Sequence, residues 1–85
     1  MAKKTVTVGS SVGLHARPAA TVAAAAGEYD DEITLTLGDG DPVDASSVLL
    51  IMTLGAEHGA EVVVESDNAE AVDAIAALIE KDLDA

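Results

Sequence analysis

The chain has 85 residues, no cysteine and a formal net charge of −12 at pH 7, because 16 Asp and Glu residues outnumber 4 Lys and Arg residues. This length suits one small domain, and the lack of cysteine excludes a disulfide framework and a thiolate metal site. The acidic balance argues against binding to nucleic acid, which depends on clustered Lys and Arg. We therefore expect one domain over residues 1–85, with no metal and no cofactor.

The high net charge does not indicate disorder here, because 49% of the residues are hydrophobic. Two explanations of the acidity stay open. One is adaptation to high salt, since the screening length falls to about 3 Å at 1 M ionic strength and carboxylate repulsion fades. The other is a set of partners with basic docking faces, and the sequence does not separate the two.

No membrane-spanning or targeting segment is predicted. No stretch approaches the roughly 18 uninterrupted apolar residues of a transmembrane helix. The first residues run directly into an alternating pattern, without an apolar signal region. We expect a cytoplasmic protein that does not insert into membranes.

The first predicted elements are a short strand and an alanine-rich helix. Residues 5–8 alternate polar and apolar side chains, which is typical of a half-buried strand. Residues 9–13 read as a loop of small residues. Residues 16–26 are rich in alanine, the residue of highest helix propensity, and predict a helix. Gly27 stands where a glycine in the left-handed conformation would end that helix.

The middle of the chain predicts two strands and a short helix. Residues 33–37 alternate again, with their three apolar side chains expected to face the core. The Gly- and Asp-rich residues 38–42 predict a turn, followed by a short strand around Val43. Ser47 is expected to cap a short apolar helix over residues 48–54, which ends before a glycine.

The last part of the chain predicts a buried strand and a helix. Residues 60–65 hold three successive valines, which favours a central strand. Asp67 and Glu70 resemble a capping box with Asp67 as the cap. The following helix has one apolar stripe for the sheet, formed by Val72, Ile75, Ile79 and Leu83. The order β-α-β-β-α-β-α predicts an α+β fold with the helices on one side of an antiparallel sheet.

Residues 13–20, Gly-Leu-His-Ala-Arg-Pro-Ala-Ala, carry the chemistry. A helix that begins at His15 or Ala16 leaves its first N–H groups without intrahelical partners, and Pro18 fits such a first turn. The N–H groups of Ala16 and Arg17 then form an anion site, to which Arg17 adds a planar cation. The neutral imidazole of His15 is a nucleophile near pH 7. The pattern predicts a histidine that accepts a phosphoryl group, and the alternative is a capping or surface histidine.

Residues 13–19 resemble the active-site signature of the HPr family, the histidine phosphocarriers of the phosphoenolpyruvate-dependent sugar phosphotransferase system (PTS). Residues 46–55 resemble the second motif of that family, a serine that opens a short helix ending in Leu-Gly. The resemblance covers essentially the whole chain. It implies an open-faced β-sandwich, in which a four-stranded antiparallel sheet has three helices on one face.

The resemblance also implies a function. Phosphorylated enzyme I would donate a phosphoryl group to Nδ1 of His15, and the chain would pass it to an enzyme IIA domain for coupled sugar uptake and phosphorylation. Arg17 matches the arginine that steadies the phosphate, with the N–H groups of Ala16 and Arg17 binding it. Such a protein is a stoichiometric carrier rather than an enzyme, and a monomer is expected.

The chain departs from the family pattern at several positions. Val12 stands where a small polar residue often precedes the histidine by three positions, and it cannot bond to the imidazole. The lysines with which family members commonly dock their partners are replaced by Ala24, Gly27 and Ser46. Docking is therefore expected to rely on apolar contact through the short helix, at Val48, Leu49 and Met52.

Ser47 matches the serine that a dedicated kinase modifies in some bacterial relatives, so a serine kinase is a further candidate partner. A plain helix cap is the favoured interpretation, and Ser46 leaves the alignment ambiguous by one residue. Two rival functions stay open. One is a regulatory relative that acts by binding partners rather than in sugar transport. The other is a ligand-binding domain, for which the short loops leave little room for a pocket.

Overall fold

The computed structural model describes residues 2–9 and 13–81. In chain order the elements are β1 (Ala2–Thr7), α1 (Ala16–Ala26), β2 (Ile33–Leu37), β3 (Val43–Asp44), α2 (Val48–Thr53), β4 (Glu61–Ser66) and α3 (Ala69–Glu80). This order confirms the predicted β-α-β-β-α-β-α arrangement and the α+β class.

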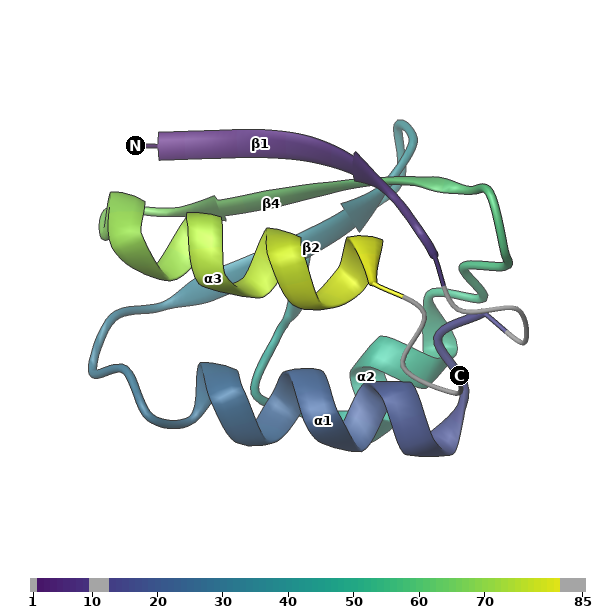
Figure 1. The fold of residues 1–85 in the computed structure, drawn as a ribbon, viewed down its shortest axis with the longest axis horizontal. Helices are drawn as coiled ribbons and strands as arrows, with labels where there is room; N and C mark the ends of the chain where they lie inside the picture. The colour runs from purple at the N-terminus through teal and green to yellow at the C-terminus, as the bar shows by residue number, and fades with distance from the viewer. Residues whose placement is uncertain (1, 10–12, 82–85) are drawn as a thin grey trace.

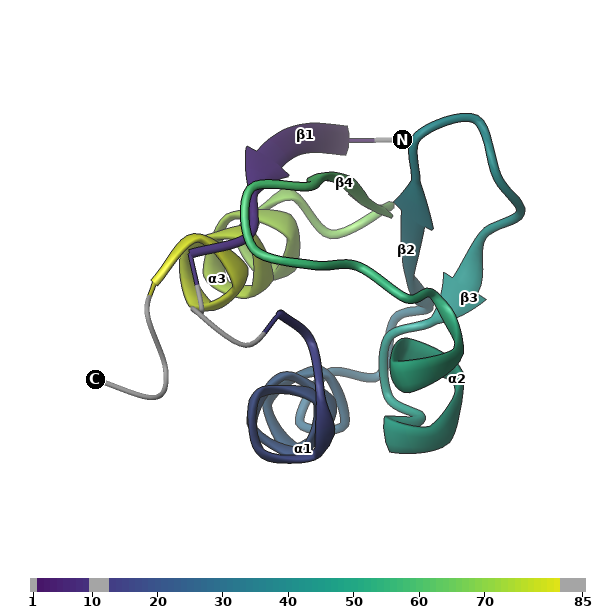
Figure 2. The ribbon, with the colours of Figure 1, turned by 90° about the vertical axis from the view of Figure 1, so that its right-hand side faces the viewer.

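The four strands form one antiparallel sheet in the order β1-β4-β2-β3. The valine-rich strand β4 is central, as predicted, because β1 and β2 pair with it on either side. Val62 and Val64 point into the core, whereas Val63 lies on the opposite, partly exposed face. All three helices lie on one side of the sheet: α3 runs beneath β1 and β4, and α1 and α2 lie side by side farther from it (Figures 1 and 2).

The core between these layers is built from small aliphatic side chains. The predicted stripe of α3 is confirmed at Val72, Ile75 and Ile79, which are buried, and Leu83 lies outside the described residues. Ile33 and Leu35 of β2 are buried as predicted. The third inward residue of β2, Leu37, is half-buried because it lies at the end of the sheet.

Two strands begin at residues other than those predicted. Strand β1 starts at Ala2 rather than at residue 5, because β4 offers it partners from Ser66 to Glu61. Strand β4 spans Glu61–Ser66, so it begins and ends one residue later than the predicted residues 60–65. Ser66 is fully buried, and its hydroxyl oxygen accepts a hydrogen bond from the N–H of Asn68 at 3.1 Å.

The predicted left-handed end of α1 is wrong. Gly27 has φ −66° and ψ −14°, and its N–H donates to the carbonyl of Ala23 at 2.9 Å. The chain continues in tight turns, in which the N–H groups of Glu28 and Tyr29 donate to carbonyls three residues earlier. The end of α2 follows the prediction, because Gly55 takes a positive φ of 68° directly after Leu54.

The predicted cap of α3 is also wrong by one residue. Asn68, not Asp67, is the N-cap, and its Oδ1 accepts hydrogen bonds from the N–H groups of Glu70 and Ala71 at 3.1 and 3.2 Å. Its Nδ2 donates to Asp31 at 3.0 Å, which ties the start of α3 to the segment before β2. The amide side chain offers both a donor and acceptors here, which a carboxylate does not.

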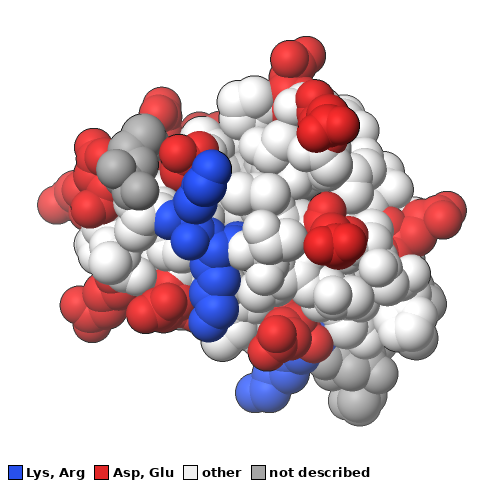
Figure 3. Space-filling view, turned by 90° about the horizontal axis from the view of Figure 1, so that it is seen from above, with Lys and Arg blue, Asp and Glu red and all other residues white. Residues whose placement is uncertain are grey.

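Carboxylates cover much of the surface. Figure 3 looks onto the side of the sheet away from the helices, where acidic side chains lie all around the outline and the blue of Lys and Arg is confined to a few places. Two of the four basic residues, Lys3 and Lys4, are exposed on β1. Within residues 2–9 and 13–81, no helix is both long enough and apolar enough to cross a membrane.

Candidate functional site

The start of α1 presents His15 to solvent. His15 is the N-cap residue, with extended backbone angles φ −84° and ψ −167°, and its carbonyl accepts the N–H of Ala19 at 2.8 Å. Its side chain is exposed and makes no capping hydrogen bond. A histidine whose role is to cap the helix is therefore excluded, and among the described residues no hydrogen bond engages its ring.

The first turn of α1 forms an open anion site. The N–H groups of Ala16 and Arg17 have no intrahelical partner at this end of the helix, and Pro18 has no N–H to leave unpaired. Both residues are exposed, while Pro18 and Ala19 are buried and anchor the turn. The first turn holds no acidic residue, so no carboxylate of this turn neutralises the positive end of the helix dipole.

Arg17 is the single charged residue of α1, and α2 has none. In a chain with 16 carboxylates, two neighbouring helices thus carry none of them. Figure 2 shows these two helices packed next to each other at the edge of the fold that faces away from the sheet. Neither helix therefore offers Arg17 a carboxylate partner, and its guanidinium can meet an anion without competition from its own helix.

Helix α2 exposes an apolar patch beside α1. Leu49 is 71% exposed, Val48 37%, and Leu50 and Met52 40% each, whereas Ile51 is buried. The three residues predicted for docking all reach the surface. Leu50 was missed, because a continuous apolar run of five residues does not reveal which side chains turn inward. We call Val48, Leu49, Leu50 and Met52 the α2 patch.

The start of α2 is fixed by two serines with different roles. Ser47 is the N-cap, and its hydroxyl oxygen accepts the N–H of Leu50 at 3.2 Å. Ser46 donates to Oδ1 of Asp44 from both its N–H, at 2.9 Å, and its hydroxyl, at 2.7 Å. These two hydrogen bonds stabilise the ionised carboxylate and lower the pKa of Asp44 below its usual value.

Of the other positions singled out in the sequence, some lie within the described residues and one lies outside them. Ala24, Gly27 and Ser46, which replace the docking lysines, are all exposed. Val12 lies outside the described residues. His58 is an exposed loop residue. Among the described residues no group of three His, Asp or Glu side chains gathers in a way that could hold a metal ion.

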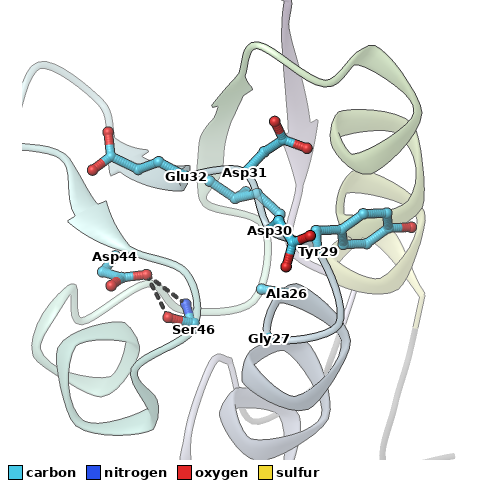
Figure 4. Close-up of a pocket in the computed structure, with 9 residues that line it drawn as sticks. Ala26, Gly27, Tyr29, Asp30, Asp31, Glu32, Asp44 and Ser46 are labelled. Atoms are coloured by element: carbon cyan, nitrogen blue, oxygen red, sulfur yellow. Dashed lines mark hydrogen bonds between the residues drawn. The ribbon is translucent and has the colours of Figure 1, made fainter.

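A hollow of about 350 Å³ is present, although the short loops were expected to leave little room for a pocket. It lies between the end of α1 and the segments before β2 and α2, and it is lined mainly by polar groups, among them Asp30, Asp31 and Asp44 (Figure 4). An 11-residue helix is about 16 Å long, so this hollow lies far from His15.

The comparisons with known proteins agree with this site. The family PTS-HPr, described as the PTS HPr component phosphorylation site, matches residues 2–81. Phosphocarrier protein HPr of Streptomyces coelicolor is 45% identical over 67 residues, which cover 79% of this chain and 72% of that protein. Phosphocarrier protein NPr of Klebsiella oxytoca is 32% identical over 77 residues, which cover 91% of this chain and 86% of that protein.

Solved structures extend the agreement to the whole fold. The crystal structure of a phosphocarrier protein HPr from Bacillus anthracis has a TM-score of 0.85 and 32% identity, and the match covers 92% of this chain and 95% of that one. Family match, sequence identity and fold thus coincide on the same residues. The chain belongs to the HPr family of phosphocarrier proteins of the phosphotransferase system.

Proposed function

We propose that this chain accepts a phosphoryl group from phosphorylated enzyme I on His15 and passes it to an enzyme IIA domain of a sugar PTS. The observation that carries the proposal is the exposed imidazole of His15, which stands at the start of α1 and makes no capping bond. Family membership supports the carrier role. The protein acts in the cytoplasm as a monomer and a stoichiometric carrier, not as a catalyst.

In the accepting step, Nδ1 of His15 attacks the phosphorus in line with the bond to the donor. The new N–P bond forms as the donor's bond to phosphorus breaks, and the donor keeps that electron pair. Negative charge on the phosphoryl oxygens is met by the N–H groups of Ala16 and Arg17 and by the guanidinium of Arg17. Transfer to the next partner reverses these events, so one cation without a metal suits a carrier that must also release the group.

Partner docking would use the α2 patch, whose exposed apolar side chains lie next to α1. Because neither helix carries a lysine, apolar burial rather than charge attraction holds the complex. Ser47 is half-buried, and its hydroxyl caps α2, which supports the structural role over modification. Phosphorylation of Ser47 by a kinase stays a prediction.

The test uses the protein at molar salt with phosphoenolpyruvate and a cognate enzyme I that is shown to phosphorylate itself. We expect one added phosphoryl group in the intact mass, which mild acid removes. His15→Ala abolishes the addition, and Arg17→Ala slows it by about 100-fold or more because the cation is lost.

His58→Ala is the matched control, since His58 is also exposed but lies in a loop. It should be phosphorylated like the natural protein. If the natural protein gains no phosphoryl group in this assay, the carrier role is wrong. A regulatory protein that acts by binding would then be favoured, and His15→Ala would leave its partner binding unchanged.

A further inference from the structure

The loop after α2, residues 55–59, lies along the segment that leads to His15. Antiparallel bonding continues past the ends of β1 and β4, because the N–H of Val8 donates to the carbonyl of Ala60 at 2.9 Å. The N–H of Gly59 donates in turn to the carbonyl of Val8 at 3.0 Å. The sheet is thereby linked by backbone hydrogen bonds to the chain that approaches the site.

The same loop touches the chain again directly before His15. The N–H of Leu14 donates to the carbonyl of Ala56 at 2.9 Å, and both residues are buried. One residue earlier, Gly13 has a φ of +76°, a conformation that L side chains rarely adopt. A Cβ on Gly13 would lie 2.6 Å from the carbonyl oxygen of Ala56 and 2.9 Å from the Cα of Glu57.

Two independent constraints thus require glycine at position 13. The positive φ disfavours other residues, and the backbone of the neighbouring loop fills the space that a side chain would need. Both distances are well inside the 3.4 Å at which ordinary van der Waals contact begins, and the atoms concerned belong to backbone that cannot rotate away. A side chain at this position must displace one of the two segments.

We propose that Gly13 is a positioning residue for phosphoryl transfer, an inference that rests on the proposed function of His15. Without a Cβ, the chain at Gly13 lies flat on residues 56–57, and Leu14 bonds to Ala56. This contact sets the path of the backbone from Leu14 into His15. The side chain of His15 makes no capping hydrogen bond that would hold it in place. The contact therefore aligns the imidazole with the N–H groups of the first turn of α1.

Alignment matters because in-line transfer tolerates little displacement. A shift of about 1 Å in a reacting group costs about 100-fold in rate. Gly13 precedes His15 by two residues. Leu14, which lies between them in the sequence, donates the hydrogen bond to Ala56. Displacement of the segment before His15 moves the nucleophile relative to the phosphate site, while α2 stays held by its cap at Ser47 and by the buried Ile51.

The experiment compares Gly13→Ala with Gly38→Ala. Gly38 is the matched control because it also has a positive φ, +58°, but has nothing within 4 Å of an added Cβ. Both variants carry the same kind of backbone strain, and only Gly13→Ala meets the neighbouring loop. The rate of phosphorylation by enzyme I is measured over a range of carrier concentrations, and urea unfolding and circular dichroism report the folded fraction.

We expect Gly13→Ala to lower kcat by at least about tenfold with KM changed less than about twofold, since docking is intact. Gly38→Ala should leave both constants unchanged. A Gly13→Ala protein that is folded and transfers at the natural rate overturns the proposal, as does a rise in KM with kcat unchanged. If Gly13→Ala does not fold, a semisynthetic protein with an ester in place of the Gly13–Leu14 amide decides, because it removes the N–H that donates to Ala56 and keeps every side chain. An unchanged kcat for the ester protein then overturns the proposal.

Failure of this inference differs from failure of the proposed function. If the natural protein is not phosphorylated, the carrier role is wrong before any variant is compared. Hydrogen exchange at the Leu14 amide then still reports the contact itself, with protection in the natural protein and Gly38→Ala and loss of protection in Gly13→Ala.

Discussion

At the scale of single residues, the N-cap side chains of the described helices differ in what they do. Ser47 and Asn68 each accept hydrogen bonds from the helix that follows, whereas His15 does not. An N-cap side chain with an accepting oxygen would satisfy the free N–H groups of its own helix. His15 leaves those groups open, so the start of α1 stays available for an external anion.

Asn68→Ala should lower the free energy of unfolding by about 1–2 kcal/mol, because it removes the cap of α3. The variant also loses the bond to Asp31. Urea unfolding measures the loss. Asp67→Ala is the control, since Asp67 is exposed and is not the cap, and it should change stability by less than about 0.5 kcal/mol. A larger loss for Asp67→Ala would restore the capping box that the sequence suggests.

Asp44 predicts a pH dependence with a definite sign. The hydrogen bonds from Ser46 lower its pKa in the folded state, so the ionised form contributes stability above the ordinary pKa of a free carboxyl. This contribution is lost as the pH falls through the lowered folded pKa. It is about 0.5 kcal/mol, since the group is exposed and solvent screens it.

The measurement is the difference in unfolding free energy between the natural protein and Asp44→Ala from pH 7 to pH 2. We expect the difference to be full and constant near neutral pH and to shrink in acid. Ser46→Ala, which removes the hydroxyl donor and keeps the carboxylate of Asp44, is the matched variant and should lose part of the same contribution. A difference that grows in acid would contradict the assignment.

At the scale of elements, local patterns were sufficient to predict each strand and helix from the sequence: alternation for β1 and β2, a turn for β3, successive valines for β4, alanine content for α1, a capping serine for α2 and an apolar stripe for α3. The ends were less predictable, because they depend on tertiary partners: β1 is extended by its pairing with β4, and Asn68 becomes the cap through bonds to Ser66 and Asp31. The motif around His15 also predicts a function from residue types alone, because an imidazole, a guanidinium and a proline of the first helical turn each have a known chemical role. The contact of Gly13 with residues 56–57 was not predicted, because nothing local relates segments so far apart.

The α2 patch gives a prediction that separates docking from packing. Leu49→Ser should raise the KM of phosphorylation by enzyme I several-fold, because the side chain is the most exposed of the patch. Its unfolding free energy should change by less than about 0.5 kcal/mol. Ile51→Ala should lower stability by about 2–4 kcal/mol, because Ile51 is fully buried, with an unchanged KM for the folded fraction.

Kinetics at several carrier concentrations and urea unfolding give both quantities for each variant. If Leu49→Ser leaves KM unchanged, docking occurs elsewhere on the molecule. The phosphorylation of His15 by mass would be unaffected by that outcome, so the carrier role and the docking surface are tested separately.

At the scale of the whole molecule, a net charge of −12 surrounds a core of small aliphatic residues. Such a core contributes limited buried area for each residue, while the carboxylates repel one another in the compact state. Raising NaCl from 0.01 M to 1 M shortens the screening length from about 30 Å to about 3 Å. Stability should therefore rise with the concentration of salt.

We expect the unfolding free energy to rise by at least about 1 kcal/mol over this range of NaCl. Urea midpoints at each concentration measure it. The double variant Glu61→Gln and Asp73→Asn removes two exposed negative charges and should show a weaker dependence on salt. A midpoint independent of NaCl would rule out self-repulsion and leave basic partners as the explanation of the acidity.

The strand order has a consequence for how the protein is made. Strand β4 bonds to both β1 and β2, so a growing chain that has not yet reached residue 61 holds only the short β2–β3 pairing. The apolar faces of β1 and β2 cannot be buried in the sheet until β4 has been synthesised. This favours slow, concerted formation of the sheet after most of the chain has emerged. His15 is thus synthesised early, whereas the hydrogen bonds that hold the segment before it form late.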